Sequence, residues 1–207
     1  MGNKLVYGVG VNDAEYVTQK FENFGYVGGK RKQKRIWVCH FYGVWVDMLR
    51  RCYSEKFQEK CPTYRGCSVC EGWWLFSNFK DWVEAQDFEG KQLDKDILFP
   101  GNKVYSPETC VFTSFIVNTF VIERGKARGE WPIGVSWVKH VQKFQAECNN
   151  PFTKKKEYLG LFACQEKAHE AWLTRKLELA KLLAAEQDDP RVAKALIEKY
   201  ENYKDLV

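Results

Sequence analysis

The sequence predicts an α+β protein made of two modules, residues 1–124 and residues 125–207. In the first module apolar residues recur at helical spacing, most clearly between Trp45 and Cys52. After the basic segment Gly125–Trp131 the period changes to three short β-like runs and then a long helical run. Because 45% of the 207 residues are apolar, the chain has enough of them to build a core.

The first module is expected to begin with helices. Asn12 and Asp13, with Glu15 shortly after, are typical of a helix N-cap, so a short helix to about Phe24 is predicted. The basic run Lys30–Arg35 is predicted to be a loop. The remaining expected elements are strands at Ile36–Phe41, Leu93–Leu98 and Cys110–Thr113, and helices at Tyr42–Tyr53, Trp73–Ala85 and Ser114–Glu123.

The second module is expected to be a small sheet covered on one face. Its predicted elements are strands at Ile133–Val138, Lys143–Cys148 and Glu157–Phe162, followed by helices at Gln165–Gln187 and from Asp189-Pro190 to about Tyr203. The long helix covers one face, and alternation places Lys143, Gln145 and Glu147 together on the other. The last helix is amphipathic, so it packs either on the rest of the chain or on a protein partner.

Positive charge is concentrated in two places. Between Arg124 and Gly160 eight Lys or Arg face three Glu, which gives this stretch the +5 formal charge of the whole chain. The second cluster is Lys30, Arg31, Lys32, Lys34 and Arg35. Clustered cations suit a phosphate backbone, although a solvated surface explains either cluster equally well.

Several dispersed positions of the second module form an ordered pattern: Gly134-Val135, Lys143-Phe144 with Ala146, Leu159-Gly160 with Phe162, and Glu166, Ala168 and Ala171. In these residues the module resembles the AP2 DNA-binding domain of plant transcription factors and phage proteins. The resemblance implies a sheet in the major groove of double-stranded DNA and a supporting helix behind it. The DNA contacts that follow from it are Ser136, Val138, Lys139, Lys143, Phe144, Gln145 and Glu147, with Lys154, Lys155 and Lys156 nearby. The arginines usual after Gly-Val are Ser136 and Val138 here, which predicts that phosphate contacts dominate over base reading.

The first module contains, in this order, the segments WVDMLRRCY, YRGCSVCEGW, FSNFKDW, LDKDIL and YSPETCVF, followed by Asn118. In this order the segments resemble phage-type endonucleases of the HNH class, which often carry an AP2 module. The class implies a ββα unit that holds one divalent metal. Lys95 replaces the general-base His and Thr109 replaces the strand Asn, whereas Asn118 keeps an accepted residue. The implied catalytic candidates are therefore Asp94, Lys95, Asp96 and Asn118, with Asp94 and Asp96 as oxygen ligands for Mg²⁺ or Mn²⁺.

Cysteine and histidine residues add further candidates. Cys67 and Cys70 have the spacing of a zinc knuckle, and Cys52 and Cys110 would complete a structural Zn²⁺ site, although free Cys is equally common in cores. The eight Cys are expected to be reduced in a cytosol-like compartment, the host cytoplasm if the chain is phage-encoded. All three His lie outside the ββα segment. His40, just before the first long helix, is the one placed to reach the site in space, although a lone His is more often a structural residue.

Three functions follow. The first is a double-stranded DNA-binding protein of the HNH class, with metal-dependent cleavage as its possible activity. The second is a catalytically inactive DNA-binding regulator or inhibitor of host DNA enzymes, and the third is a protein-interaction adaptor. No apolar run approaches the ~18 residues of a membrane span, so no membrane partner is expected.

Overall fold

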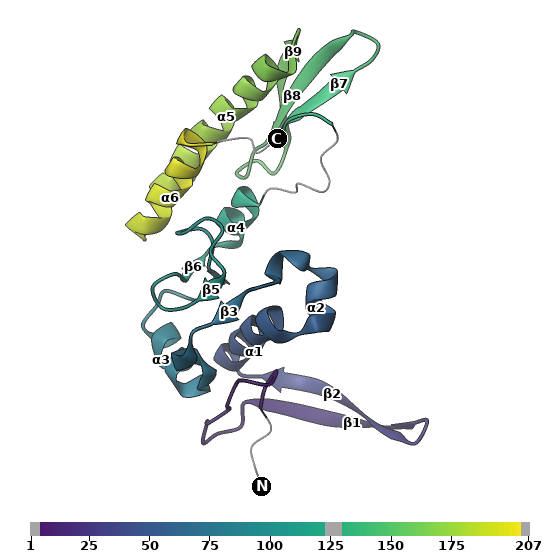
Figure 1. Cartoon of the computed structure of the whole chain (residues 1–207), viewed down its shortest axis with the longest axis vertical. Coiled ribbons are helices and arrows are strands. Elements are labelled where there is room, and N and C mark those ends of the chain that lie inside the picture. The colour runs from purple at the N-terminus through teal and green to yellow at the C-terminus, as the bar shows by residue number, and fades with distance from the viewer. Residues whose placement is uncertain (1–4, 123–129, 204–207) are drawn as a thin grey trace. The chain divides into compact units, whose positions relative to one another are not determined.

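The computed structural model describes residues 5–122 and 130–203, apart from the side chains of Val27 and Lys30. Helices and strands are mixed along the chain, which confirms the α+β class (Figure 1). The chain divides into two compact units, Met1–Phe112 and Thr113–Val207. Most of the expected linker Gly125–Trp131 lies outside the described residues, and the boundary between the two units lies earlier in the sequence, after Phe112.

The first unit begins with an antiparallel hairpin, β1 (Gln19–Val27) and β2 (Lys30–Val38). The expected helix to Phe24 and the expected loop at Lys30–Arg35 are therefore both wrong. The turn residues Gly28 and Gly29 both have positive φ, +58° and +74°. A two-residue turn of this kind matches the twist of the strands it joins, and glycine adopts it without a steric penalty.

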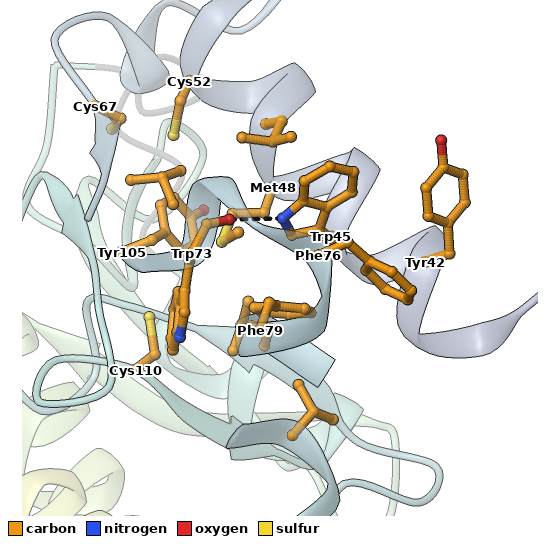
Figure 2. Close-up of a cluster of buried hydrophobic side chains, with 14 of the residues drawn as sticks. Tyr42, Trp45, Met48, Cys52, Cys67, Trp73, Phe76, Phe79, Tyr105 and Cys110 are labelled. Carbon is orange, nitrogen blue, oxygen red and sulfur yellow. Dashed lines mark hydrogen bonds between the residues drawn. The ribbon is translucent and has the colours of Figure 1, made fainter. Parts of the chain in front are cut away.

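The core of the first unit is aromatic. Helix α1 (His40–Tyr53) buries Trp45, Met48 and Leu49 at helical spacing, and helix α3 (Phe76–Glu84) packs against it. The Trp45 indole donates a 2.7 Å hydrogen bond to the carbonyl of Trp73 (Figure 2). The buried ring therefore leaves no polar atom unsatisfied, which is the usual condition for burying tryptophan.

Short elements connect these helices. They are α2 (Glu55–Lys60), 3₁₀ turns at Pro62–Tyr64 and Glu71–Trp74, and strands β3 (Ser68–Val69), β4 (Gln92–Asp94), β5 (Val104–Tyr105) and β6 (Val111–Thr113). Strand β3 pairs with β5 in parallel, and β4 pairs with β6. The expected strand at Leu93–Leu98 is thus reduced to β4, and β5 is an addition to the expected set.

The second unit holds α4 (Phe115–Val121), a three-stranded antiparallel sheet and two helices. The strands are β7 (Val135–Val138), β8 (Lys143–Asn149) and β9 (Lys156–Phe162), in the order β7-β8-β9. Helix α5 (Gln165–Ala185) packs along the sheet and α6 (Pro190–Glu201) packs on α5. Asp189 caps α6 through the backbone N–H of Arg191, as the Asp-Pro pair predicts.

The sheet and α5 meet closely at Gly134. Its φ is +81°, and a Cβ built there would lie 2.1 Å from Cδ1 of Trp172 on α5. Only glycine fits both the backbone conformation and this contact. Within the described ranges 5–122 and 130–203, no helix has the length and apolar character that crossing a membrane requires.

Candidate nucleic-acid interface

One face of the β7-β8-β9 sheet is covered by α5, and the other is open at its Val138 and Lys143 end and borders a cavity lined by α4 at its other end. Ala146 and Cys148 are buried on the helix side, whereas Lys143, Gln145 and Glu147 alternate with them on the other side. The register adds Ser136 and Leu161 beside Gln145. Val138, Asn149, Lys156 and Tyr158 point to the same side. We call these residues, together with Ser136, Lys143, Gln145, Glu147 and Leu161, the open face. The expected shared face of Lys143, Gln145 and Glu147 is confirmed.

A β-bulge decides which residues of β9 belong to the open face. The register shifts between Ala146 and Glu147, so that Ala146 lies opposite Gly160 but Glu147 lies opposite Tyr158. Without the shift, Tyr158 would share the helix side with Gly160. Instead Tyr158 lies on the open face and is 61% exposed. Sequence reasoning missed Tyr158 because strict alternation gives the wrong side, and a bulge has no reliable signal in the sequence.

Cations flank the open face at both of its ends. The β7–β8 turn carries the exposed Lys139, and the β8–β9 turn carries the exposed Lys154 and Lys155. Strand β8 between them has seven residues and spans roughly 20 Å at 3.4 Å per residue. That length exceeds the ~12 Å width of a major groove, so the two turns suit phosphates on either side of one groove.

Phe144 has a supporting position. It lies on the helix side of β8, where its ring is 5.0 Å from Trp131 and 4.7 Å from Trp137. The sequence placed Phe144 among the DNA contacts, but this aromatic group fixes the sheet from behind. Phe144 therefore does not belong to the open face.

An ion pair holds α5 against β9. Arg175 on α5 donates to both carboxylate oxygens of Glu157, at 2.7 and 3.2 Å, and Asn150 donates to the same carboxylate. These hydrogen bonds lower the pKa of Glu157, and the one from Arg175 has the larger effect. Bidentate pairs of this kind fix geometry as well as charge. On the open face itself, Lys156 pairs with Glu147 at 2.9 Å, an exposed contact that contributes at most about 1 kcal/mol.

One end of the open face borders a cavity of about 770 Å³ inside the second unit. Phe115 and Ile116 of α4 line it together with Ser136, Glu147 and Lys156 of the sheet. The end near Val138 and Lys143 is not part of this cavity lining. A long flat ligand would therefore approach the sheet most freely from the Lys143 end.

The basic run of the first unit lies on strand β2. Arg31, Lys32, Lys34 and Arg35 are all exposed, whereas the side chain of Lys30 lies outside the described set. They are therefore held in a strand with fixed spacing, although the sequence predicted a loop. Successive residues of a strand point to opposite sides, so Arg31 and Arg35 lie on one side of β2 and Lys32 and Lys34 lie on the other.

The turn Asp94–Lys95–Asp96 in the first unit is tightly bonded. Asp94 Oδ1 accepts the backbone N–H groups of Asp96 and Ile97, each at 2.7 Å. The Lys95 side chain is only 5% exposed, and its ammonium donates to the carbonyl of Asn102 at 2.7 Å and to the Asp96 carboxylate. Burial raises the pKa of Asp94 despite those two N–H donors.

These contacts suit a structural turn better than a metal site. One oxygen of each carboxylate is already engaged, and the Lys95 ammonium places a positive charge beside Asp96. The Mg²⁺ or Mn²⁺ site therefore stays a prediction from the resemblance. Thr109 has a structural role of the same kind, since its hydroxyl bonds the carbonyl of Val104 at 2.7 Å. Asn118 lies on α4 in the second unit, where it is half-buried.

Three of the four candidate zinc ligands, Cys52, Cys67 and Cys110, are buried in the core, and Cys70 is half-buried against it. Cys52 and Cys67 lie at one side of the aromatic core, and Cys110 lies at another (Figure 2). Burial raises the pKa of Cys52 and of Cys110 to about 12, and it also raises the pKa of Cys70. A zinc ligand must be a thiolate. In the described part of the chain, no three or more His, Cys, Asp or Glu side chains are grouped to hold a metal ion, so the zinc site stays a prediction from spacing.

The three histidines occupy separate places. His40 begins α1, and its ring stacks on Phe88 with centroids 5.5 Å apart. His140 is exposed in the β7–β8 turn. His169 on α5 stacks on Trp172 and lies 3.0 Å from the carbonyl of Ile133, so it helps to fix the sheet on its helix.

Comparison with known proteins adds no assignment, because no family model, no curated protein and no solved structure matches the chain.

Proposed function

We propose that the protein binds double-stranded DNA through the open face of the β7-β8-β9 sheet. The observation that carries the proposal is the uncovered row of polar and basic side chains on β8, with lysines in the turns at both ends. Strands of a sheet are able to lie in a major groove, and the flanking lysines would then reach phosphates.

The chemistry of the face favours phosphate contacts over base reading. Lys143 and Gln145 are able to bond guanine and adenine edges respectively, and Ser136 bonds either base. No arginine stands among the open-face residues, and arginine is the commonest reader of guanine. We therefore expect a modest sequence preference and a strong dependence on salt.

The resemblance to the AP2 domain supports the same proposal. That resemblance implies three antiparallel strands backed by a helix, and this unit has a sheet of that kind with α5 on its covered face. The resemblance of the first module to HNH endonucleases adds an expected association with duplex DNA. Both remain resemblances on the residues quoted for them.

Duplex binding is tested by fluorescence anisotropy across a salt titration. Replacing Lys143 and Gln145 by Ala should weaken binding about tenfold or more, since one lost base contact of this kind is equivalent to roughly 1–3 kcal/mol. The matched control is Lys194→Ala, which also removes one positive charge, from an exposed position on α6. An affinity that is indifferent to salt, or an equal loss in both variants, would overturn the proposal.

The carboxylates of Asp94 and Asp96 take part in hydrogen bonds within their own turn. We therefore favour a DNA-binding regulator over an endonuclease as the function of this protein. Strand cleavage is tested with supercoiled plasmid and Mg²⁺ or Mn²⁺, comparing the natural chain with Asp94→Asn. That substitution keeps an oxygen for the two N–H donors and removes the charge that a metal needs. Metal-dependent nicking that disappears in Asp94→Asn would identify an endonuclease instead. The amphipathic α6 buries Val192, Leu196 and Tyr200 inside the second unit, which weakens the case for an adaptor.

A further inference from the structure

Among the described residues of the first unit, nothing covers either face of the β1–β2 hairpin. Every described side chain from Lys20 to Tyr26 and from Arg31 to Trp37 is exposed. Large apolar groups are among them, including Tyr26 at 73% and Phe24 at 59% exposure. An isolated two-stranded hairpin is only marginally stable, and exposed apolar surface of this extent is typical of interaction sites. The hairpin extends from α1 as a ribbon (Figure 1), which is a form suited to entering a groove.

The charge of the hairpin identifies the chemistry of its partner. Residues 19–38 contain six Lys or Arg and a single acid, Glu22. Within the described ranges no carboxylate forms a salt bridge with Arg31, Lys32, Lys34 or Arg35. Apolar groups surrounded by unneutralised cations fit a polyanion that also offers flat or apolar surface. Nucleic acid has both properties.

The register divides the hairpin into two chemically different faces. Arg31, Gln33 and Arg35 alternate along β2 and therefore share one face. Their partners across the ladder are Tyr26, Asn23 and Phe21, in that order. Gln33 donates a 3.0 Å hydrogen bond to Asn23, which confirms that the central pair lies on one side. Lys32 and Lys34 point to the opposite side.

This division matches the division of labour in a major groove. Arginine bonds guanine edges and Asn or Gln bonds adenine edges, whereas lysine on the far side reaches phosphates. A major groove admits a two-stranded ribbon, and the two register shifts in this hairpin increase its twist. The deep, narrow major groove of A-form RNA does not admit such a ribbon.

We propose that the β1–β2 hairpin enters the major groove of duplex DNA and reads bases through Arg31, Gln33 and Arg35. This site is separate from the open face of β7-β8-β9, and the inference does not depend on that face. It supplies the arginines that the open face lacks, so sequence preference would come from the first unit.

The test compares two hairpin variants of equal charge in the full chain. The reading variant is Arg31→Ala, Gln33→Ala, Arg35→Ala, and the opposite-side variant is Lys32→Ala, Lys34→Ala. Each removes two positive charges from exposed positions, and a thermal melt checks that both still fold. Duplexes are selected from a random pool, and binding to the selected and an unselected duplex is measured against salt.

The natural chain should prefer the selected duplex, and the reading variant should lose about tenfold or more of that preference for each base contact removed. The opposite-side variant should keep the preference, bind every duplex more weakly and show a salt slope smaller by about 1.8. Guanine N7 atoms in the selected site should be protected from methylation by the natural chain and exposed again in the reading variant.

Other outcomes separate this inference from the proposed function. A reading variant that keeps both preference and N7 protection overturns the inference, and so does tighter binding to single-stranded DNA than to duplex. If Lys143→Ala with Gln145→Ala leaves binding unchanged while the reading variant loses it, the inference holds and the open-face proposal fails. Loss of preference in both hairpin variants to the same extent would reduce the hairpin to a non-specific cation surface and also overturn the inference.

Discussion

Gly134 is the position where one added methyl group should have the largest effect on the second unit. Gly134→Ala forces an L residue to adopt a φ of +81°, which costs about 1–2 kcal/mol. The new Cβ would also lie 2.1–2.2 Å from ring atoms of Trp172, which is 4% exposed between the sheet and α6. Overpacking of this kind costs about 1–3 kcal/mol. The free energy of unfolding should therefore fall by about 2–5 kcal/mol.

The measurement is thermal and urea unfolding of the full chain. For a unit of this size, a loss of 2 kcal/mol lowers Tm by about 8 °C or more. Gly101→Ala is the control, because Gly101 has a φ of +80° but no atom within 4 Å of its added Cβ. A Gly134→Ala loss no greater than that of Gly101→Ala would refute the steric argument. Adding Trp172→Ala should make the two losses non-additive, since it removes the group that the new methyl meets.

Three further predictions concern the first unit and the response to acid. Lys95→Met should lower the free energy of unfolding by about 1.5–3 kcal/mol, because it removes a charged donor from the carbonyl of Asn102, and duplex affinity should not change. Asp13→Ala should lower it by about 1 kcal/mol in urea unfolding, because Asp13 caps α3 through the backbone N–H of Ser77; no loss would show the cap to be replaced by water. Hydrogen bonds from Arg175, and to a smaller extent from Asn150, hold the pKa of Glu157 in the folded protein below its usual value. The contribution of Glu157 to the free energy of unfolding is therefore complete above its pKa in the unfolded chain and is lost as the pH falls through its pKa in the folded protein. Stability should then decline below about pH 4, less steeply in Glu157→Gln, and an identical decline in both proteins would contradict this account.

The sequence predicted the elements whose signals are local. Helix α1 follows from the spacing of its buried residues, and β8 follows from alternation of Lys143, Gln145 and Glu147 with apolar neighbours. Ser114 caps α4 through the backbone N–H of Val117, close to the expected start of that helix. Each of these signals acts within one or two turns or strands.

The first hairpin shows why other elements were mistaken. Asn12 and Asp13 looked like the cap of a following helix, but Asp13 caps α3 from 64 residues away. A cap that is supplied by a distant segment cannot be distinguished from a local one in a single sequence. The Gly28-Gly29 pair between aromatic runs was the available signal for a hairpin. The bulge that turns Tyr158 outward had no comparable signal.

The carbonyl of Phe120, near the end of α4, accepts two donors from the helices of the second unit. Lys176 reaches it from α5 at 3.0 Å and the Tyr200 hydroxyl reaches it from α6 at 3.1 Å. Phe120 itself is 5% exposed, with its ring 5.4 Å from that of Tyr200. A helix that the ββα resemblance assigns to the first module is thus fastened into the second. A fragment meant to carry the second unit should therefore begin at Thr113. A fragment that began at residue 125 would lack α4 and the Phe120 carbonyl, and Tyr200 would lose the ring and the hydrogen-bond acceptor that cover it.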